Sequence, residues 1–352
     1  MRRLSGGNPV KNVKSVSRAL ALALIVGAPL LAVTTASAAD KITIIVGGIE
    51  KQIYLPIVLT QQLGYFKDEG LDVELLNTRA GVEAENELLA GAVQGVVGFY
   101  DHTIDLQSKG KYIESVVQFS QAPGEVELVS SKHPEIKSPA DFKGKTLGVT
   151  GLGSSTDFLT QYLAVRAGLK PGDYSLLPVG AGNTFIAAIK QNQIQAGMTT
   201  EPTIARLLKT GAAKVLVDMR TPEKTEAALG GLYPAASFYV QSSWVESHKD
   251  ELQKLANAMV KTMHYIATHS AEQIADKMPK DYYAGDKALY VQGLAGGKAM
   301  FTPDGRMPAN GPETVLKVQA TFNKTVKGKQ IDLSKTYTTA FVDAANKKLS
   351  SN

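Results

Sequence analysis

The sequence predicts an α/β protein with two lobes, each built around a largely parallel sheet. Two observations support this prediction. A strand–helix–strand–helix–strand pattern occurs twice, and the chain of 352 residues is long enough for two lobes of ordinary domain size. Alternating strands and helices favour right-handed crossovers and parallel strands.

The repeat begins with a β-rich run that ends in glycines. The first copy opens with KITIIVGG at Lys41 and the second with KTLGVTGLG at Lys145, which lies 104 residues later. A helical pattern follows each run, at 54–65 in the first copy and 155–167 in the second. Similar order at nearly constant spacing indicates the same supersecondary unit written twice.

The remaining elements of the two copies also correspond. Predicted strands at 71–76 and 174–179 come next, then helices at 82–90 and 184–191. Each copy closes on another β-rich run, with Gln94 and Gln195 at matching positions 101 residues apart. The elements match in order although few residues are identical.

Further strands should connect the lobes. Strands near 115–119 and 126–131 are expected to lead the chain out of the first lobe, and 235–241 to bring it back. We therefore predict a discontinuous first lobe, 39–131 and 235–352, and a second lobe, 132–234.

The last part of the chain reads as mostly helical. A long helix should start at Ser243, where Ser243 and Glu246 fit a capping box. The stretch 270–352 contains further helices, interrupted by turn-forming residues at 301–312, and is expected to pack on the first lobe.

The amino end has the order of a secretory signal peptide. Residues 1–18 hold five basic residues and no acid, 19–33 are apolar, and Ala36–Ala38 is a small-residue cleavage site. The apolar run is too short for a typical membrane-spanning helix. We expect export, cleavage near Ala38 and a periplasmic protein. The alternative is an uncleaved anchor.

Charge and cysteine content exclude several classes of function and attachment. The whole chain has 38 basic and 33 acidic residues, and removal of residues 1–38 leaves 33 of each. A neutral mature chain argues against nucleic-acid binding, which needs a clustered basic surface. The chain has no cysteine, so neither a disulfide nor a lipidated cysteine is available.

Ligands of open parallel sheets bind beyond the carboxyl ends of the strands. Facing edges of two lobes should therefore line one cleft. The segments that would line it are 47–54, 77–81, 99–102, 120–124, 151–156, 180–184 and 199–202.

The loop at 151–157 (GLGSSTD) is the most specific sign of a ligand-binding site in this cleft. Ser154, Ser155 and Thr156 precede a helix whose free N–H groups attract an anion. The alternative is that Ser154 and Asp157 only cap the helix. The third glycine of a dinucleotide fingerprint and a phosphate-cradling lysine motif are both missing, so no nucleotide cofactor is expected.

Other cleft residues suggest a ligand with hydrogen-bond donors. Tyr54 offers an aromatic wall, Asn183 and Thr184 start a helix, Asp101 and His102 follow a buried strand, and Glu201 precedes a proline. His102 could equally form a hydrogen bond with a neighbouring backbone group, and Glu201 could compensate the dipole of the helix that follows it. With only Lys51 and Arg79 as candidate cations, the acids favour a ligand with N–H donors or a positive group beside any anionic end.

Four segments resemble the nitrate/sulfonate/taurine and thiamine-precursor binding proteins of ABC importers. They are YLPIVLTQQLGYFKDEGLDVELL (54–76), LLAGAVQGVVGFYDHT (88–103), GKTLGVTGLGSSTDFL (144–159) and PVGAGNTFIAAIKQNQIQAGMTTEP (178–202). The resemblance implies a type II periplasmic-binding-protein fold that closes by a hinge over its ligand and docks on a membrane permease. We expect a monomer that captures a small organic anion or zwitterion, or alternatively a nitrogen heterocycle.

The resemblance also implies where the ligand is held. The family's ligand loops fall on Gly48 with Tyr54, on Asp101 with His102, on Ser154 to Thr156, on Asn183 and on Glu201. Members often have an aromatic residue before the acid–proline pair, whereas this chain has Thr200. The ligand's identity is therefore open.

An enzyme of the same fold is the competing class, because some cofactor-precursor synthases resemble it. The export signal argues against it, and the five histidines fit no metal-ligand spacing. No nucleophile-elbow motif is present to make a hydrolytic triad of Asp101, His102 and a serine. We predict a binding protein with neither cofactor nor metal.

Overall fold

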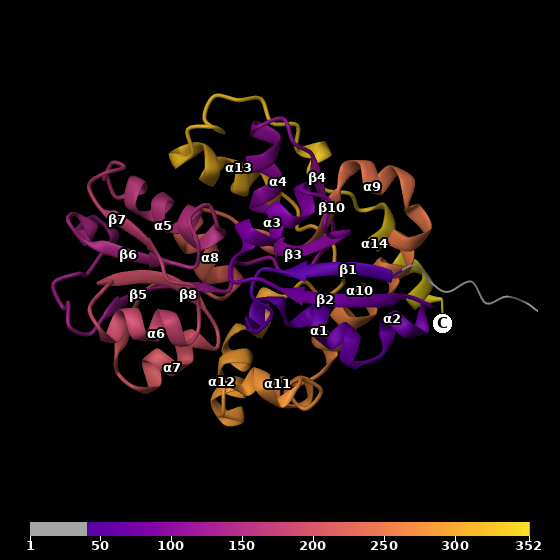
Figure 1. Ribbon diagram of the computed structural model, residues 1–352, viewed down its shortest axis with the longest axis horizontal. Helices are drawn as coiled ribbons and strands as arrows, with labels where there is room; N and C mark the ends of the chain where they lie inside the picture. Colours follow the sequence, from indigo (N-terminus) through magenta and orange to yellow (C-terminus); the bar gives the residue numbers. More distant parts are fainter. Residues whose placement is uncertain (1–40, 352) are drawn as a thin grey trace, which may run out of the picture. The chain divides into compact units, whose positions relative to one another are not determined.

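The computed structural model describes residues 41–351. The predicted signal peptide, 1–38, and its cleavage position lie outside these residues. Within the described part, strands and helices alternate as the repeat predicted, and they form two five-stranded sheets (Figure 1).

The first sheet has the strand order β2-β1-β3-β10-β4. Its strands are β1 (Lys41–Val46), β2 (Asp72–Asn77), β3 (Gly95–Phe99), β4 (Ile113–Gln118) and β10 (Ala236–Gln241). β1 pairs in parallel with β2 and β3, whereas β10 pairs antiparallel with β3 and β4. The chain therefore returns to this sheet only after the whole second sheet.

The second sheet repeats that arrangement with the order β7-β6-β8-β5-β9. Its strands are β5 (Glu125–Ser130), β6 (Thr146–Val149), β7 (Ser175–Pro178), β8 (Ala196–Thr200) and β9 (Ala213–Met219). β6 pairs in parallel with β7 and β8, and β5 is antiparallel to β8 and β9. The equal orders agree with the internal repeat of the sequence.

The pairing of β5 corrects one predicted boundary. We placed residues up to 131 in the first lobe, but β5 is an inner strand of the second sheet. Its side chains explain this, since Val126 and Leu128 pack in one core with Phe185 and Ile204. The chain thus crosses to the second sheet at 119–124.

Helices cover both faces of each sheet (Figure 1). The first lobe has α1 (Leu55–Gln62), α2 (Tyr65–Asp68), α3 (Gly81–Leu89) and α4 (Asp101–Ser108), with α9 (Ser242–Ser247) and α10 (Lys249–Thr268) after β10. The second has α5 (Ser155–Arg166), α6 (Asn183–Lys190), α7 (Thr203–Lys209) and α8 (Pro222–Leu229). Short 3-10 turns lie at Gln52–Tyr54, Pro139–Phe142, Lys280–Tyr283, Lys298–Met300 and Leu333–Lys335.

The predicted long helix from Ser243 is two helices. The chain bends at His248, whose φ of −129° and ψ of 48° are not helical, and the imidazole stacks on Trp244 with ring centroids 4.7 Å apart. α9 already begins at Ser242 with Gln241 as its N-cap. Ser243 therefore lies inside the first turn, so the predicted capping box was wrong.

The carboxyl-terminal helices contact both lobes, not only the first as predicted. They are α11 (Ala271–Ala275), α12 (Lys287–Gly297), α13 (Gly311–Phe322) and α14 (Ala340–Ser350). α12 packs on α7, and α13 packs on both α4 and α5. Phe322 of α13 meets Phe158 of α5 with ring centroids 5.8 Å apart.

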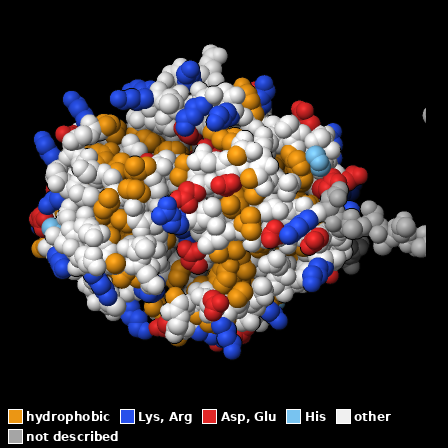
Figure 2. All heavy atoms as spheres, in the orientation of Figure 1, with side chains coloured by type: hydrophobic (Ala, Val, Ile, Leu, Met, Phe, Trp, Pro, Cys, Tyr) orange, Lys and Arg blue, Asp and Glu red, His pale blue; other side chains and the backbone are white. Residues whose placement is uncertain are grey.

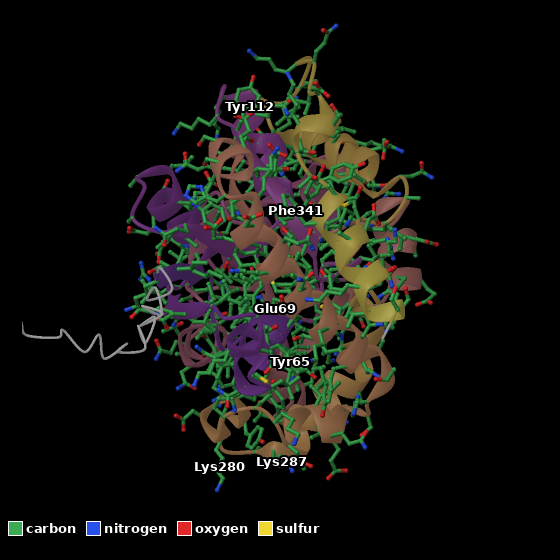
Figure 3. All side chains as sticks on the ribbon, turned by 90° about the vertical axis from the view of Figure 1, so that its right-hand side faces the viewer. Tyr65, Glu69, Tyr112, Lys280, Lys287 and Phe341 are labelled. Carbon is green, nitrogen blue, oxygen red and sulfur yellow. The ribbon has the colours of Figure 1, made fainter. Side chains whose placement is uncertain are left out.

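α14 is fixed to the first lobe by α2 and α10. Glu69, just after α2, accepts hydrogen bonds from Lys348 of α14 and from Asn257 of α10, at 3.0 and 2.9 Å. Tyr65, Glu69 and Phe341 lie on the face of the molecule that Figure 3 turns toward the viewer. Among residues 41–351, no helix is both long and apolar enough to cross a membrane.

Candidate ligand-binding site

The two lobes meet around a small enclosed space, which we call the inner cavity. Its walls are Lys51, Tyr54, Gly81 and Phe99 from the first lobe and Glu125, Thr150, Ser154, Ser155, Thr156 and Thr200 from the second. Its volume is about 10 Å³, close to what a single water needs. A substrate can therefore enter only when the lobes move apart.

Direct contacts hold the lobes together beside this cavity. The Ser155 hydroxyl donates to Asp101 Oδ1 at 2.8 Å, and the Val82 N–H donates to Ser154 Oγ at 3.3 Å. A side chain on Gly151 would place its Cβ 2.8 Å from the Cβ of Ala80. Gly151 is thus a glycine because the first lobe approaches it so closely.

Asp101 is buried behind the inner cavity and is not among its lining residues. Its second oxygen accepts a hydrogen bond from the Tyr233 hydroxyl at 2.9 Å, so both oxygens have protein partners. Burial raises the pKa of Asp101, while His102 and the two hydroxyl donors act in the opposite direction. Asp101 thus helps to join the two lobes, and its contact with a ligand stays a prediction.

His102 also lies behind the wall, where it is paired with an acid. Its Nδ1 lies 2.7 Å from Glu85 Oε2, and both side chains are buried. Burial alone would lower the pKa of His102, but the Glu85 carboxylate, with smaller contributions from Asp101 and Asp105, raises it to about 9. The imidazole is therefore positively charged at neutral pH. Its Nε2 faces Gly81, where a Cβ would lie only 2.9 Å away.

The loop at 151–157 positions the start of α5 at the inner cavity. Ser154 is the N-cap residue, but its side chain makes no capping hydrogen bond. Asp157 accepts from the Gly153 N–H at 2.7 Å and so orders the loop. Thr156 Oγ1 accepts from the Thr150 N–H at 3.0 Å. The helix amino terminus, with its partial positive charge, is left facing the cavity.

Lys51 is the cation of the inner cavity. Its side chain is 5% exposed, and its Nζ donates to the carbonyl oxygen of Gly47 at 2.6 Å and lies 5.8 Å from the centre of the Tyr54 ring. Burial lowers the pKa of Lys51, while Glu50, Glu125 and Glu83 raise it. Gly48 lies under this side chain, since a Cβ there would be 2.4 Å from Lys51 Cε.

Glu125 and Thr200 provide the polar groups of the opposite wall. Glu125 is the first residue of β5 and pairs with Thr200, the last residue of β8. Burial raises the pKa of Glu125 well above its usual range, and Asp101 raises it further. Glu125 Oε2 and Thr200 Oγ1 are buried without a hydrogen-bond partner.

A second space, which we call the outer cavity, contains the remaining predicted residues. It has a volume of about 420 Å³ and is lined by Asn183, Thr184 and Glu201, with Lys51 shared between the two cavities. The Asn183 side-chain oxygen accepts from Arg206 at 2.7 Å, and Thr184 donates to the Ala181 carbonyl at 2.9 Å. Both hydrogen bonds lie within the second lobe.

Glu201 already has protein partners for both of its oxygens. Arg220 donates to Oε1 at 3.0 Å and the Ala205 N–H donates to Oε2 at 2.9 Å, at the start of α7. Burial raises the pKa of Glu201, and these two partners lower it. The contact with the Ala205 N–H is the one expected if Glu201 compensates the dipole at the start of α7, whereas the contact with Arg220 was not predicted.

The ten predicted site residues thus fall into three groups. Tyr54 and Ser154 to Thr156 line the inner cavity, whereas Asn183, Thr184 and Glu201 line the outer one. Gly48, Asp101 and His102 support the walls from behind. Glu125 was not among the predicted residues, because the ligand loops were expected at the carboxyl ends of parallel strands. β5 runs antiparallel, so its amino end lies at the cleft.

No metal centre accompanies these cavities in the described part of the chain. Residues 41–351 contain no group of three or more histidine, cysteine or acidic side chains arranged to hold a metal ion.

The family description NMT1/THI5 like matches residues 52–273, which include most residues of both cavities. The chain belongs to the NMT1/THI5-like family. This confirms the predicted family resemblance.

Solved structures similar to this NMT1/THI5-like protein establish its fold. A protein from Bordetella bronchiseptica RB50 is 34% identical with a TM-score of 0.85, over 88% of this chain and 98% of that one. The alkanesulfonate-binding protein SsuA from Xanthomonas axonopodis pv. citri, bound to MOPS, is 16% identical with a TM-score of 0.69, over 86% and 99%. The predicted periplasmic-binding-protein fold is confirmed.

A curated relative of this family member is an enzyme by name. The yeast 4-amino-5-hydroxymethyl-2-methylpyrimidine phosphate synthase THI11 (Saccharomyces cerevisiae) is 28% identical over 164 residues, which are 46% of this chain and 46% of the relative. The chain therefore spans about half the length of that relative.

The surface of the NMT1/THI5-like chain is mixed in charge. On the face shown in Figure 2, basic and acidic side chains are interspersed rather than gathered into one large patch of either sign. This agrees with the balance of 33 basic and 33 acidic residues after position 38.

Proposed function

We propose that this chain is the substrate-binding protein of an ABC importer, exported to the periplasm, where it captures a small organic solute for a membrane permease. The observation that supports this most is the inner cavity, which both lobes wall and which no substrate can enter without lobe movement. A binding protein needs this property to hold its ligand and then release it.

We further propose that the captured solute carries an oxyanion, such as a sulfonate or carboxylate. The amino terminus of α5 and the Lys51 ammonium both face the inner cavity, and both attract negative charge. His102, charged and one layer behind, adds to the positive potential. The alkanesulfonate-binding SsuA has the same fold.

Closure would be stabilised by contacts that only the closed lobes make. The Ser155–Asp101 hydrogen bond joins α5 of the second lobe to α4 of the first. The protein would then act as a monomer, with the cleft open to accept ligand and closed to present it to the permease.

A second candidate is the binding or conversion of a nitrogen heterocycle, favoured by the similarity to a pyrimidine phosphate synthase. Tyr54 and Phe99 give the inner cavity aromatic walls, and Glu125 could accept hydrogen bonds from a ring amino group. A heterocycle recovered chemically unchanged after incubation would support capture, and its conversion would establish an enzyme instead.

A thermal-shift screen tests the leading proposal. The library would hold alkanesulfonates, taurine, nitrate, aromatic acids and aminopyrimidines. A ligand present at 100 times its Kd adds about 2.7 kcal/mol to stability, so an oxyanion should stand out and should fail to stabilise Lys51→Met. No stabilisation by any oxyanion, combined with turnover of an aminopyrimidine, would reject the proposal.

A further inference from the structure

The helix α12 contacts three parts of the molecule along its length. It lies between α7 of the second lobe and α11, as Figure 1 shows. Its amino end meets the second lobe, its middle meets the first lobe, and the residues after its carboxyl end meet the segment 119–124 that joins the lobes. Each of these attachments is of a different kind.

The carboxyl end of α12 is fixed to the joining segment. The Gln121 N–H donates to the Met300 carbonyl oxygen at 2.8 Å, and the Thr302 N–H donates to the Phe119 carbonyl oxygen at 2.9 Å. Gly124 lies under the Met300 side chain, since a Cβ there would be 2.6 Å from Met300 Sδ. Backbone hydrogen bonds and close packing therefore hold this end in place.

The amino end of α12 is attached to the second lobe by an ion pair. Asp286 is the N-cap residue, and its Oδ1 accepts from the Leu289 N–H at 3.0 Å. Its Oδ2 accepts from the ammonium of Lys209, the last residue of α7, at 2.6 Å. The two side chains are 35% and 60% exposed. Water can replace such an exposed pair at little cost in free energy.

Behind this ion pair, α12 and α7 are separated by a groove of about 690 Å³. Ala205 and Leu208 of α7 line one side, and Leu289, Gly293 and Gly296 of α12 line the other. The interior of a folded unit is close-packed, with few spaces larger than a water molecule. The two helices can therefore separate without the disruption of a shared apolar core.

The middle of α12 meets both lobes at one point. A Cβ on Gly293 would lie 3.1 Å from Glu201 Cδ of the second lobe and 3.5 Å from Gln52 Oε1 of the first. Gln52 Nε2 donates to the Tyr290 carbonyl oxygen of α12 at 2.8 Å, and the Gln52 N–H donates to the Glu201 carbonyl oxygen at 3.0 Å. The absence of a side chain at Gly293 lets Glu201 come this close.

We propose that α12 is a strap that stabilises the closed lobes, with the Lys209–Asp286 ion pair as its latch. The carboxyl end of the strap stays on the joining segment, and the amino end separates from α7 when the lobes open. The strap thereby sets the fraction of ligand-free protein that is open. The inference rests on the lobe movement that the proposed capture function requires, and it holds whatever the solute is.

Electron-spin distance measurements on the ligand-free protein test the latch. The chain has no cysteine, so nitroxide labels on Glu87→Cys of α3 and Lys190→Cys of α6, both exposed and in different lobes, would report lobe separation. Asp286→Asn removes the charge and keeps a good N-cap residue. Asp286→Asn and Lys209→Met should each raise the open fraction about threefold. The double variant should raise it no further, because both changes remove the same contact.

A neighbouring ion pair of α12 supplies the control. Lys287 pairs with Asp276, just after α11, at 2.5 Å and does not contact the second lobe through this pair. Lys287→Met should leave the open fraction unchanged, and Lys209→Arg should keep the unaltered value. Salt at about 1 M, where the Debye length is about 3 Å, should open the unaltered protein as Lys209→Met does. It should have no further effect on Asp286→Asn.

A wedge under the strap is a stronger, independent probe. Gly293→Val would push α12 away from Glu201 and should raise the open fraction at least tenfold. Gly296→Ala, whose Cβ meets nothing within 4 Å, should leave it unchanged. The wedge and the ion-pair variants act at different positions, so either series tests the strap if the other fails to fold.

The outcomes separate the strap from the capture function. A measurable open fraction that neither Lys209→Met, Asp286→Asn nor Gly293→Val changes overturns the strap and leaves capture standing. An equal rise in Lys287→Met overturns the latch, because the effect would then come from the charge of α12 in general. Lobes that stay closed in every variant and at every salt concentration overturn the strap together with the lobe movement that capture needs.

Discussion

The Ser155 hydroxyl donates a hydrogen bond to Asp101 Oδ1 across the two lobes, with 2.8 Å between the oxygens. The two residues lie 54 positions apart in the chain, at the starts of α5 and α4. The two helices are not equivalent in the internal repeat, because α5 corresponds to α1 and not to α4. The contact joins Ser155, which lines the inner cavity on the second lobe, to Asp101, which lies behind the wall formed by the first lobe.

Ser155→Ala should weaken ligand binding by up to about tenfold, because a typical hydrogen bond contributes about 0.5–1.5 kcal/mol and the closed form would lose it. Isothermal titration of the ligand found in the screen measures this. Ser131→Ala serves as the control, since that hydroxyl donates to Gly211 within the second lobe. Equal affinities of the two variants would contradict the role of Ser155 in closure.

Lys51→Met should lower affinity for an oxyanion at least 100-fold, since it removes the buried cation of the inner cavity while keeping an apolar side chain of similar length. The matched variant is Arg79→Met, whose parent pairs with Glu83 at the surface. Arg79→Met should change the Kd less than threefold. A similar loss in both variants would show long-range attraction rather than contact by Lys51.

Gly151→Ala should reduce affinity more than tenfold with little change in the melting temperature of the ligand-free protein. The added methyl group would meet Ala80 at 2.8 Å only when the lobes are closed. Gly296→Ala, which meets nothing within 4 Å, is the control. Loss of stability without loss of affinity in Gly151→Ala would place the clash inside one lobe instead.

Glu85→Gln should destabilise the protein by about 3–5 kcal/mol at pH 7, because it leaves the buried His102 without its counter-charge. The pKa of His102 is raised to about 9 in the folded protein. Its contribution to stability is therefore complete below about pH 6.5, its unfolded value, and is lost as the pH rises through about 9.

Urea unfolding at pH 6, 7.5 and 9 would detect that dependence. The unaltered protein should lose up to about 3 kcal/mol from this group over the range, and Glu85→Gln should lose far less. Glu135→Gln, which changes an exposed acid beside His133, should leave the dependence as it is. An unchanged pH profile in Glu85→Gln would mean that His102 is neutral when folded.

The repeated pattern in the sequence was enough to predict the α/β lobes, because alternating elements restrict the possible connections. It could not predict that β5 and β10 run antiparallel to their neighbours. The direction of a strand depends on the end of the sheet from which the chain enters it, and the repeat does not specify that end. This reversal brought Glu125 to the cleft and moved a lobe boundary.

The candidate site was predictable in its loops but not in the roles of individual side chains. The glycine-rich start of α5 was recognisable from its residues, and the structure places Ser154 to Thr156 at the inner cavity. Whether Asp101, His102 and Glu201 face a ligand or a protein partner depends on Tyr233, Glu85 and Arg220, which lie far away in the sequence. No local pattern specifies those pairs.

The position of β10 between β3 and β4 also constrains how the chain can fold as it is made. The first sheet lacks an inner strand until residue 236 has been synthesised, by which point every strand of the second sheet already exists. The second lobe is therefore the first part of the chain able to complete its own sheet. The half of the molecule that begins the sequence finishes last, and until then its unpaired β3 and β4 edges are open to other strands.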